Sequence, residues 1–184
     1  MGTANDFEPE RLVLALLYPE GFDLGPALAA FASSLGEADF AGPRLPFAWT
    51  DYYEAEMGPG LVRGFYSYPR LVDPGRLAEL KLWTNELEER FSSEGRRRLN
   101  IDPGLLCLGR FSLATTKDRS HRIPLGRGIY AELTLLYERG AWRSLPWTYA
   151  DWRSPEYLAV LGELRALYRR DLRNRPRADD LELA

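Results

Sequence analysis

The chain has 184 residues, of which 45% are hydrophobic and 28% are charged, and this composition is typical of one folded globular domain. Its net charge of −3 and its pI near 5.4 lack the basic excess that most nucleic-acid-binding domains carry. Cys107 and His121 are the only residues of their types, which excludes an internal disulfide and a zinc site built from cysteine and histidine within one chain. The single cysteine and the absence of a signal-peptide pattern lead us to expect a cytoplasmic protein without a membrane segment.

The first half of the chain is predicted to alternate strands with helices. A continuous apolar run indicates a buried strand, and prolines place a later strand at a sheet edge. Asp73 and Pro74 provide an N-cap and a first-turn proline for the clearest helix, whose apolar residues recur every three or four positions. The predicted elements are strand 11–18, helix 25–35, strand 44–50, strand 61–68 and a helix from 74 to about 93.

The second half is predicted to be rich in strands and to close with a helix. Apolar and polar residues alternate over residues 129–138, which is the pattern of a strand with one buried face. Ser154 and Pro155 indicate the start of the last helix, because proline is tolerated in a first turn. The predicted elements are a turn at 103–104, a strand 105–115 with a break at Gly109, a hairpin of 121–125 and 129–138, a helix from Pro155, and a disordered tail from Asn174.

This order of elements predicts an α+β fold. The first part matches the ferredoxin-like β-α-β-β-α-β arrangement, to which the hairpin and a C-terminal helix are added. We expect an antiparallel sheet with its helices packed on one face. Residues 1–184 are interpreted as a single domain with a core over about residues 11–173.

Five segments carry a resemblance to a known family. They are TDYYEAEMG (50–58), KLWTNELE (81–88), RLNIDPG (98–104), ATTKDRSHRIPLGRGIYAELTL (114–135) and LPWTYADW (145–152). Together they resemble the family numbered 4416 among bacterial domains of unknown function, over about residues 11–170. The resemblance implies no activity, so every role below is inferred from residue chemistry. We expect the five segments to surround one site.

The hairpin predicts one charged pair. If residues 126–128 form a three-residue connection, Leu125 pairs with Ile129, and Arg122 stands opposite Glu132. Two interpretations remain open. The pair is either a surface ion pair, which contributes on the order of 0.2–1 kcal/mol, or part of an anion clamp in which Arg122 presents its guanidinium to a phosphate or carboxylate.

The loop before the hairpin concentrates polar side chains between two strands, a common location for binding groups. Thr116, Lys117 and Asp118 are predicted to bind substrate together with Arg122. His121 is a candidate general base with Glu132, because its ordinary pKa lies near neutrality, although a lone histidine is more often structural. The chain has no GxxxxGK[ST] loop, which excludes a P-loop.

Carboxylates elsewhere suggest a weaker metal site. Asp51, Glu54 and Asp102 have the oxygen ligands that Mg²⁺ or Mn²⁺ prefers. The alternative interpretation is a capping box, in which Asp51 and Glu54 open a single helical turn.

Two further groups have both a structural and a functional interpretation. Lys81, Asn85 and Glu88 follow one helix flank, and form either a surface ion-pair network or a pocket wall. Tyr149, between two tryptophans, belongs either to a core lid or to a surface on which a planar base or sugar stacks.

These groups lead to two functional hypotheses. The first is a small-molecule enzyme or ligand-binding domain for an anionic, nucleotide-like metabolite. The alternative is a non-enzymatic module that binds RNA or a protein partner through the arginines of segments 96–98 and 165–173. The residues leave open whether the protein is an enzyme and whether it forms oligomers.

Overall fold

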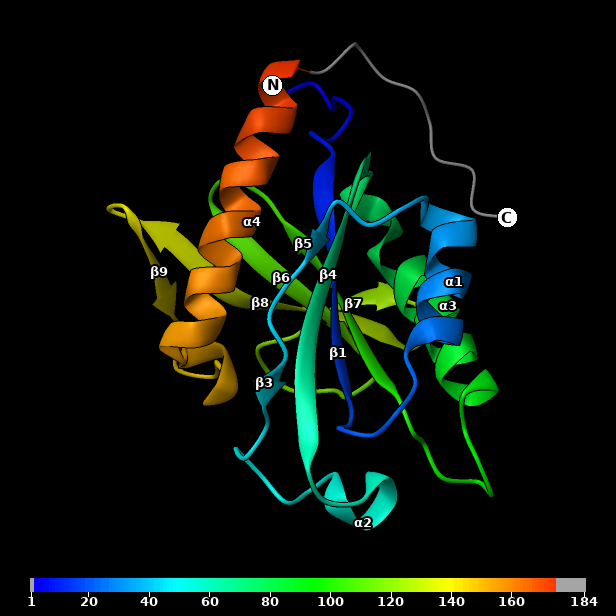
Figure 1. The fold of residues 1–184 in the computed structure, drawn as a ribbon. Coiled ribbons are helices and arrows are strands. Elements are labelled where there is room, and N and C mark those ends of the chain that lie inside the picture. Colours follow the sequence, from blue (N-terminus) through cyan, green and yellow to red (C-terminus); the bar gives the residue numbers. More distant parts are fainter. Residues whose placement is uncertain (1, 175–184) are drawn as a thin grey trace.

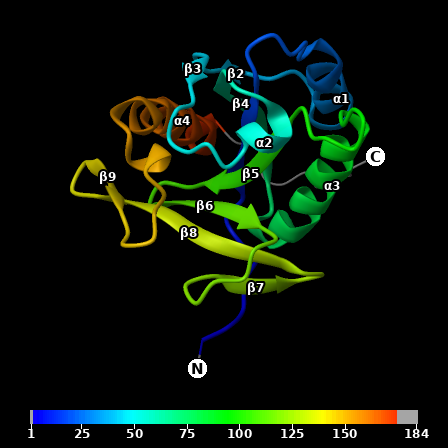
Figure 2. The same ribbon diagram turned by 90° about the horizontal axis from the view of Figure 1, so that it is seen from below.

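The computed structural model describes residues 2–174, which form one antiparallel sheet with helices on both faces (Figure 1). The strands run in the order β2-β4-β1-β5-β6-β8-β7, and β3 also pairs with β4 and β9 with β8. Figure 2 shows β7 and β8 at the end of the sheet away from β2. The elements are β1 (Glu10–Pro19), α1 (Gly25–Leu35), β2 (Phe40–Ala41), β3 (Leu45–Pro46), α2 (Glu54–Met57), β4 (Leu61–Val72), α3 (Leu77–Arg90), β5 (Asn100–Leu106), β6 (Arg110–Thr115), β7 (Ile123–Gly126), β8 (Ile129–Glu138), β9 (Ala141–Ser144) and α4 (Pro155–Asn174).

The predicted α+β class and its ferredoxin-like start are confirmed. Strands β2, β4, β1 and β5 are adjacent in that order, with β1 central and antiparallel to both neighbours. Helices α1 and α3 cover one face of these strands, because Phe31 and Leu80 pack with the even-numbered apolar residues of β1. Asp73 accepts a hydrogen bond from the backbone N–H of Gly75, as its predicted capping role requires.

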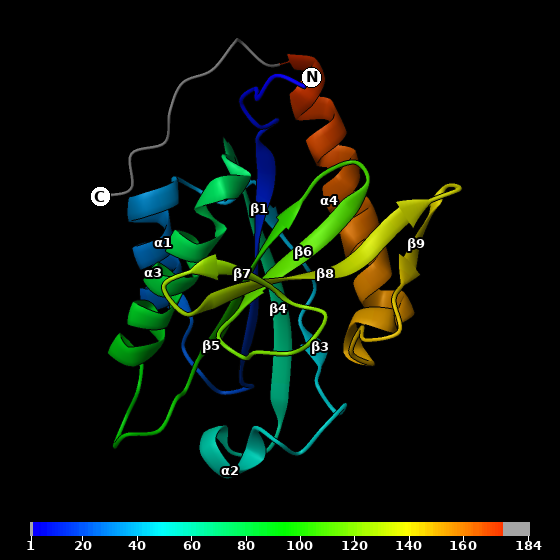
Figure 3. The ribbon, with the colours of Figure 1, turned by 180° about the vertical axis from the view of Figure 1, so that it is seen from behind.

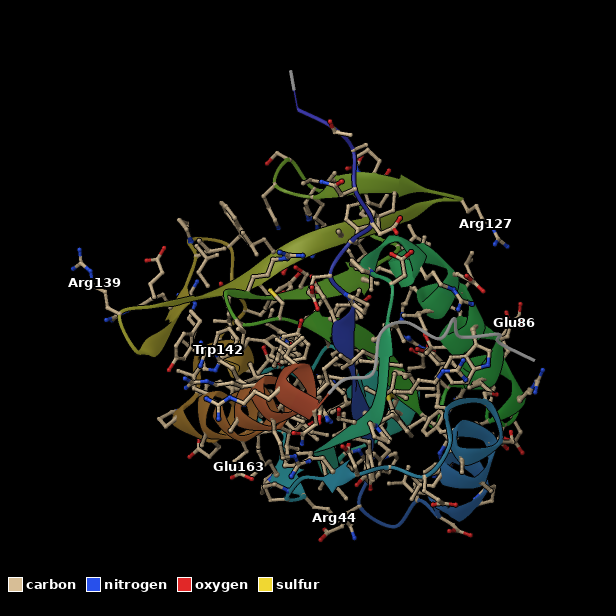
Figure 4. All side chains as sticks on the ribbon, turned by 90° about the horizontal axis from the view of Figure 1, so that it is seen from above. Arg44, Glu86, Arg127, Arg139, Trp142 and Glu163 are labelled. Carbon is tan, nitrogen blue, oxygen red and sulfur yellow. The ribbon has the colours of Figure 1, made fainter. Side chains whose placement is uncertain are left out.

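The expectation that all helices pack on one face is wrong. Helix α4 lies on the face opposite α1 and α3 (Figure 2), where Leu161 and Leu164 pack against Val13 and Ala15 of β1. Every residue of β1 from Glu10 to Tyr18 is buried, so both faces of this strand need an apolar cover. Figure 4 shows β9 reaching beside α4, with Arg139 at the tip of the β8–β9 hairpin.

Two further predictions about elements need correction. The strand expected over residues 44–50 is reduced to the two-residue strand β3, and the two-residue strand β2 lies before that range. The turn expected at Pro103 and Gly104 is absent, because both residues lie inside β5. Gly104 is instead required by close packing, since a Cβ atom there would lie 2.5 Å from Cζ of Phe111. The predicted break at Gly109 is confirmed as the turn between β5 and β6.

The β7–β8 hairpin has a bulge that the predicted register lacks. Ile123 lies opposite Ala131, but Gly126 rather than Leu125 lies opposite Ile129. The predicted neighbourhood of Arg122 and Glu132 is nevertheless present, as described below. The expected disordered tail lies outside the described residues except for Asn174, which ends α4. Among residues 2–174, we find no helix with the length and apolar character that crossing a membrane requires.

Candidate functional site

A cavity begins where β5 separates from β6. These strands pair only through Gly104, Leu105 and Leu106 of β5, so the earlier part of β5 lacks a strand on that side. Side chains of α3 take the place of the missing strand. Lys81 donates from Nζ to the carbonyl of Ile101 over 2.8 Å, and Glu88 accepts a hydrogen bond from the N–H of Ile101 over 2.8 Å. The backbone N–H and carbonyl of Ile101 are thereby satisfied while a polar opening remains.

The opening is a cavity of about 710 Å³, and all five segments that carry the family resemblance contribute lining residues to it. The convergence expected from the sequence is therefore present in the fold, although it leaves the role of each residue open. Six cations and four carboxylates line the cavity. They are Arg63, Lys81, Arg97, Lys117, Arg119, Arg122, Glu88, Asp102, Glu132 and Asp151.

Arg63 of β4 forms the floor and is only 2% exposed. Its Nη1 atom lies 3.1 Å from Oδ2 of Asp102 and 3.3 Å from the carbonyl of Ala15, and its Nη2 atom lies 3.6 Å from Oδ2 of Asp151. Its Nε atom has no hydrogen-bond partner within the described part of the chain. A buried guanidinium with long contacts and an unsatisfied donor is incompletely compensated by the protein alone.

The two floor carboxylates respond differently to burial. Burial favours the neutral form of Asp102, but the positive charges of Arg63 and Lys81 outweigh it, so the pKa of Asp102 is lowered. For Asp151, burial is the larger effect and raises its pKa, even though Arg63 opposes the shift. Burial also raises the pKa of Tyr53, above the floor, to about 12.

The wall formed by α3 is a charged network inside the protein. Lys81 and Glu88 are each 6% exposed, so the surface-network interpretation is wrong and the pocket-wall position is what the fold provides. Glu88 also accepts from Nη1 of Arg97 over 3.4 Å, and burial raises the pKa of Glu88. Asn85 lines the cavity, and its side-chain amide makes no hydrogen bond within residues 2–174.

The opposite wall contains the predicted pair of Arg122 and Glu132, and it is buried rather than on the surface. Oε2 of Glu132 accepts from Nε of Arg122 over 2.8 Å and lies 3.0 Å from Nε2 of His121. Nη1 of Arg122 donates to the carbonyl of Lys117 over 2.7 Å. Each nitrogen of Arg122 thus contacts an internal acceptor, and its part in an anion clamp stays a prediction. Arg122 fixes the loop that carries Lys117.

The cations that have no carboxylate partner among the described residues lie at the mouth of the cavity. Lys117 and Arg119 are exposed and form no ion pair in the part of the chain that the structure describes. Nζ of Lys117 lies 4.7 Å from the centre of the Tyr52 ring, within cation–π range. Trp49, Tyr52 and Tyr149 line the cavity although they are 47%, 62% and 54% exposed.

The remaining residues of the 116–121 loop divide into two groups. Thr116 lines the cavity, whereas Asp118 and His121 do not. The His121 ring stacks on Trp147 with 5.1 Å between ring centres, and Nε1 of Trp147 donates to the carbonyl of Leu133. This arrangement matches the structural interpretation of a lone histidine.

The three carboxylates predicted to bind a metal do not assemble. Asp51 and Glu54 are exposed and do not line the cavity, while Asp102 already contacts Arg63 and Asn100. Residues 2–174 contain no group of three or more His, Cys, Asp or Glu residues arranged to hold a metal ion. The capping box is also absent, because no side chain among the described residues caps α2.

Sequence reasoning missed Arg63, Asp151 and Arg119 as site residues. Arg63 carried a usable signal, because it stands in a predicted strand at a position that alternation assigns to the buried face. Asp151 and Arg119 lie inside two of the five segments, so their neighbourhood was recognised without the individual residues.

Comparisons with known proteins identify a family and no activity. The model of the family described as domain of unknown function DUF4416 matches residues 8–168. The chain therefore belongs to this family. No curated protein and no solved structure matches the chain.

Proposed function

We propose that this member of the DUF4416 family binds a small anionic metabolite with a planar ring, of the nucleotide class, in the cavity between β5 and β6. The observation that carries the proposal is the distribution of charge. The cations of the floor and walls contact carboxylates, whereas Lys117 and Arg119 at the mouth have no such partner in the described chain. The excess positive charge of the cavity is therefore concentrated where a ligand enters.

Lys117 and Arg119 suit a phosphate group. An ammonium supplies a compact charge and a guanidinium supplies paired donors, and both form strong charge-assisted hydrogen bonds with phosphate oxygens. Arg122 donates to the backbone carbonyl of Lys117 and so limits the motion of the loop. We assign Arg122 no contact with the ligand. A fixed loop reduces the entropy lost when the anion is bound.

The exposed rings of Trp49, Tyr52 and Tyr149 suit the planar part of the ligand. Exposed apolar side chains that gather in one place often mark a binding site, and here three exposed rings line one cavity. Stacking a base on an aromatic ring contributes about 1–3 kcal/mol. These rings lie on the same cavity as the two cations, so one ligand can use both.

Two carboxylate oxygens inside the cavity suit hydrogen-bond donors of the ligand. Within the described residues, Oδ1 of Asp102 and Oε1 of Glu132 accept no hydrogen bond, while the other oxygen of each accepts at least two. Sugar hydroxyls and exocyclic amino groups are donors of the required kind.

The proposal is one of binding. Proton transfer by His121 and Glu132 is not included, because His121 does not line the cavity and Arg122 neutralises Glu132.

The test is thermal unfolding of the full chain with AMP, GMP, UMP, ribose 5-phosphate, inorganic phosphate and adenosine. A ligand at 100 times its dissociation constant adds about 2.7 kcal/mol to the unfolding free energy, or roughly 5–10 °C for a domain of this size. We expect at least one nucleotide to raise the unfolding temperature more than adenosine or inorganic phosphate, because it engages both the cations and the rings.

Variants make this test specific. Lys117→Ala and Arg119→Ala should each reduce the nucleotide-induced shift, and Arg98→Ala is the matched control, since Arg98 is exposed and does not line the cavity. A shift that survives in the folded Lys117→Ala/Arg119→Ala double variant contradicts the proposed anion position. Six compounds without any effect contradict the proposed ligand class.

A further inference from the structure

A second concentration of cations lies on α4, outside the cavity described above. Four arginines occur within nine residues of this helix, and three of them recur every four residues along one stripe. Together with Tyr137, Gly162 and Ala166 they line an open hollow of about 320 Å³. The arginines are Arg165, Arg169, Arg170 and Arg173. No carboxylate occurs among the described residues that line this hollow.

Arg165 is held in a fixed orientation. Its guanidinium carbon lies 3.5 Å from the centre of the Tyr137 ring, and its Nε atom donates to the carbonyl of Leu108 over 2.8 Å. The Tyr137 ring is itself fixed, because its hydroxyl donates to the carbonyl of Gly140 over 2.9 Å. The two terminal nitrogens of Arg165 remain for a ligand, and their orientation is set before binding.

Carboxylates of the described chain hardly neutralise the charges of the other three arginines. Arg169 and Arg173 are exposed and form no ion pair within residues 2–174. Arg170 lies 3.9 Å from Oδ1 of Asp171, but the other oxygen of Asp171 is bound to the buried Arg11. Asp171 is therefore shared between Arg170 and a second cation.

Helix stability accounts for Arg173, which lies in the last turn, but not for the whole arrangement. Cations stabilise a helix through its dipole only within the last turn, and Arg165 lies nine residues before the end of α4 at Asn174. Gly162 costs a helix about 1 kcal/mol relative to alanine. No atom lies within 4 Å of the position where its Cβ would stand, so packing does not require this glycine. Because Gly162 has no side chain, it leaves space within the hollow.

We propose that this hollow binds two or more linked phosphates. The stripe from Arg165 to Arg173 extends for about 12 Å along the helix, which exceeds a single phosphate and fits a short chain of them. Guanidinium groups match phosphate oxygens in pairs. Linked phosphates occur in free polyphosphates and in the backbone of a nucleic-acid strand, and the test below distinguishes these sources.

This site is distinct from the nucleotide cavity. The C-terminal end of α4 and the connection between α3 and β5 lie at opposite ends of the molecule (Figure 1, Figure 3). The two arginine segments considered in the sequence, 96–98 and 165–173, therefore do not form one surface. Arg97 is in addition bound to Glu56 and Glu88. Of these two segments, only residues 165–173 have arginines that line a hollow without an ion pair among the described residues.

The first experiment measures binding of the full chain to sodium tripolyphosphate and to a short fluorescent oligouridylate over a series of salt concentrations. Each phosphate neutralised on a single strand contributes about −0.7 to the slope of log K against log salt, so four contacts predict a slope of about −3. Arg165→Ala and Arg169→Ala should each weaken binding and reduce this slope by about 0.7. The matched control is Arg96→Ala, which removes an exposed arginine at the far end of the molecule.

Two further variants separate a fixed site from a diffuse positive surface. Tyr137→Leu keeps every charge but removes the ring beneath Arg165, so affinity should fall while the salt slope stays near that of the unchanged protein. Gly162→Leu should block the hollow and weaken binding without removing a charge. Lys117→Ala should leave this binding intact, which keeps the result independent of the cavity.

Each outcome is decisive. Binding of tripolyphosphate as tight as that of the oligonucleotide supports a free polyphosphate as the source, and binding of the oligonucleotide alone supports a strand. The proposal is overturned if neither probe binds. It is also overturned if Arg96→Ala weakens binding as much as Arg165→Ala, or if the folded Gly162→Leu protein binds both probes unchanged.

Discussion

Two arginines on neighbouring strands, Arg11 of β1 and Arg63 of β4, are almost completely buried, yet their surroundings differ. Arg11 donates to both oxygens of Asp39 over 2.7 and 2.8 Å, to Ser67 over 2.8 Å, and to Asp171. The contacts of Arg63 to protein oxygens are 3.1, 3.3 and 3.6 Å long. Arg63 lines a cavity, whereas Arg11 does not line either described hollow.

The difference separates a structural ion cluster from a candidate binding floor. Arg11 joins the segment before β2 and the end of α4 to the centre of the sheet, because Asp39 and Asp171 come from those elements. Nε of each arginine lacks a hydrogen-bond partner among the described residues, so the difference lies in the longer contacts of Arg63 and in its position at a polar cavity. A buried charge held by short contacts to protein oxygens contributes to the fold, and one with longer contacts beside a cavity is available to a ligand.

The largest expected effect is on stability, from Arg11→Met. This substitution leaves Asp39 without its cation and Asp171 with only the exposed Arg170, and breaking a buried ion cluster from one side costs about 3–5 kcal/mol. Urea unfolding measures the loss. The cavity should be unaffected, so any nucleotide-induced thermal shift should persist. A loss of less than about 1 kcal/mol would contradict the structural role of this cluster.

A smaller loss of stability is expected from Arg63→Met, accompanied by a loss of binding. Asp102 keeps its hydrogen bond from Asn100 and the nearby charge of Lys81, so the expected cost is about 1–3 kcal/mol. Nucleotide affinity measured by calorimetry should fall roughly tenfold or more, equivalent to about 1.4 kcal/mol. If Arg63→Met is as destabilising as Arg11→Met and leaves affinity unchanged, the two arginines do not differ in role.

The two carboxylates beside Arg63 should respond to pH in opposite directions. The pKa of Asp102 is lowered in the folded protein, so its ionised form stabilises the fold above its ordinary pKa of 3.8 and this contribution is lost as pH falls below that value. The pKa of Asp151 is raised by burial, so its ionised form costs stability above 3.8 and protonation relieves this cost as pH falls through the raised pKa.

Asparagine substitutions turn this contrast into a measurement. At pH 7 the Asp102→Asn protein should be less stable than the unchanged protein, and the Asp151→Asn protein as stable or more so. Both differences should shrink as urea unfolding is repeated at lower pH, with that of Asp151→Asn closing first. A loss of stability for Asp151→Asn that is as large as that for Asp102→Asn would contradict the assigned shifts.

The smallest effects on stability are expected at the mouth of the cavity. Lys117 and Arg119 are exposed and unpaired among the described residues, so replacing either with alanine should change the unfolding free energy by less than about 0.5 kcal/mol. Denaturant unfolding at matched salt provides the measurement. A larger loss would show that these cations support the fold, and would weaken their assignment to a ligand.

The sequence by itself determined the elements whose signals are local. The apolar run of β1, the capping residues of α3 and the alternation along β8 each specify an element through neighbouring residues, and their order specifies the ferredoxin-like start. The approach of Arg122 to Glu132 was also predictable. A bulge at Leu125 changed the pairing at the turn, but the hairpin still brought the two side chains together.

Tertiary structure alone decided what depends on distant partners. The position of α4 on the second face follows from the need to cover both sides of β1, which periodicity within α4 cannot reveal. The cavity exists because β5 and β6 pair over three residues and side chains of α3 satisfy the backbone of Ile101 beyond that pairing. Which cations are compensated is likewise a long-range property. No local signal in the sequence distinguishes Arg63, Arg122 and Lys117. In the fold, the two arginines contact carboxylates, whereas Lys117 contacts none among the described residues.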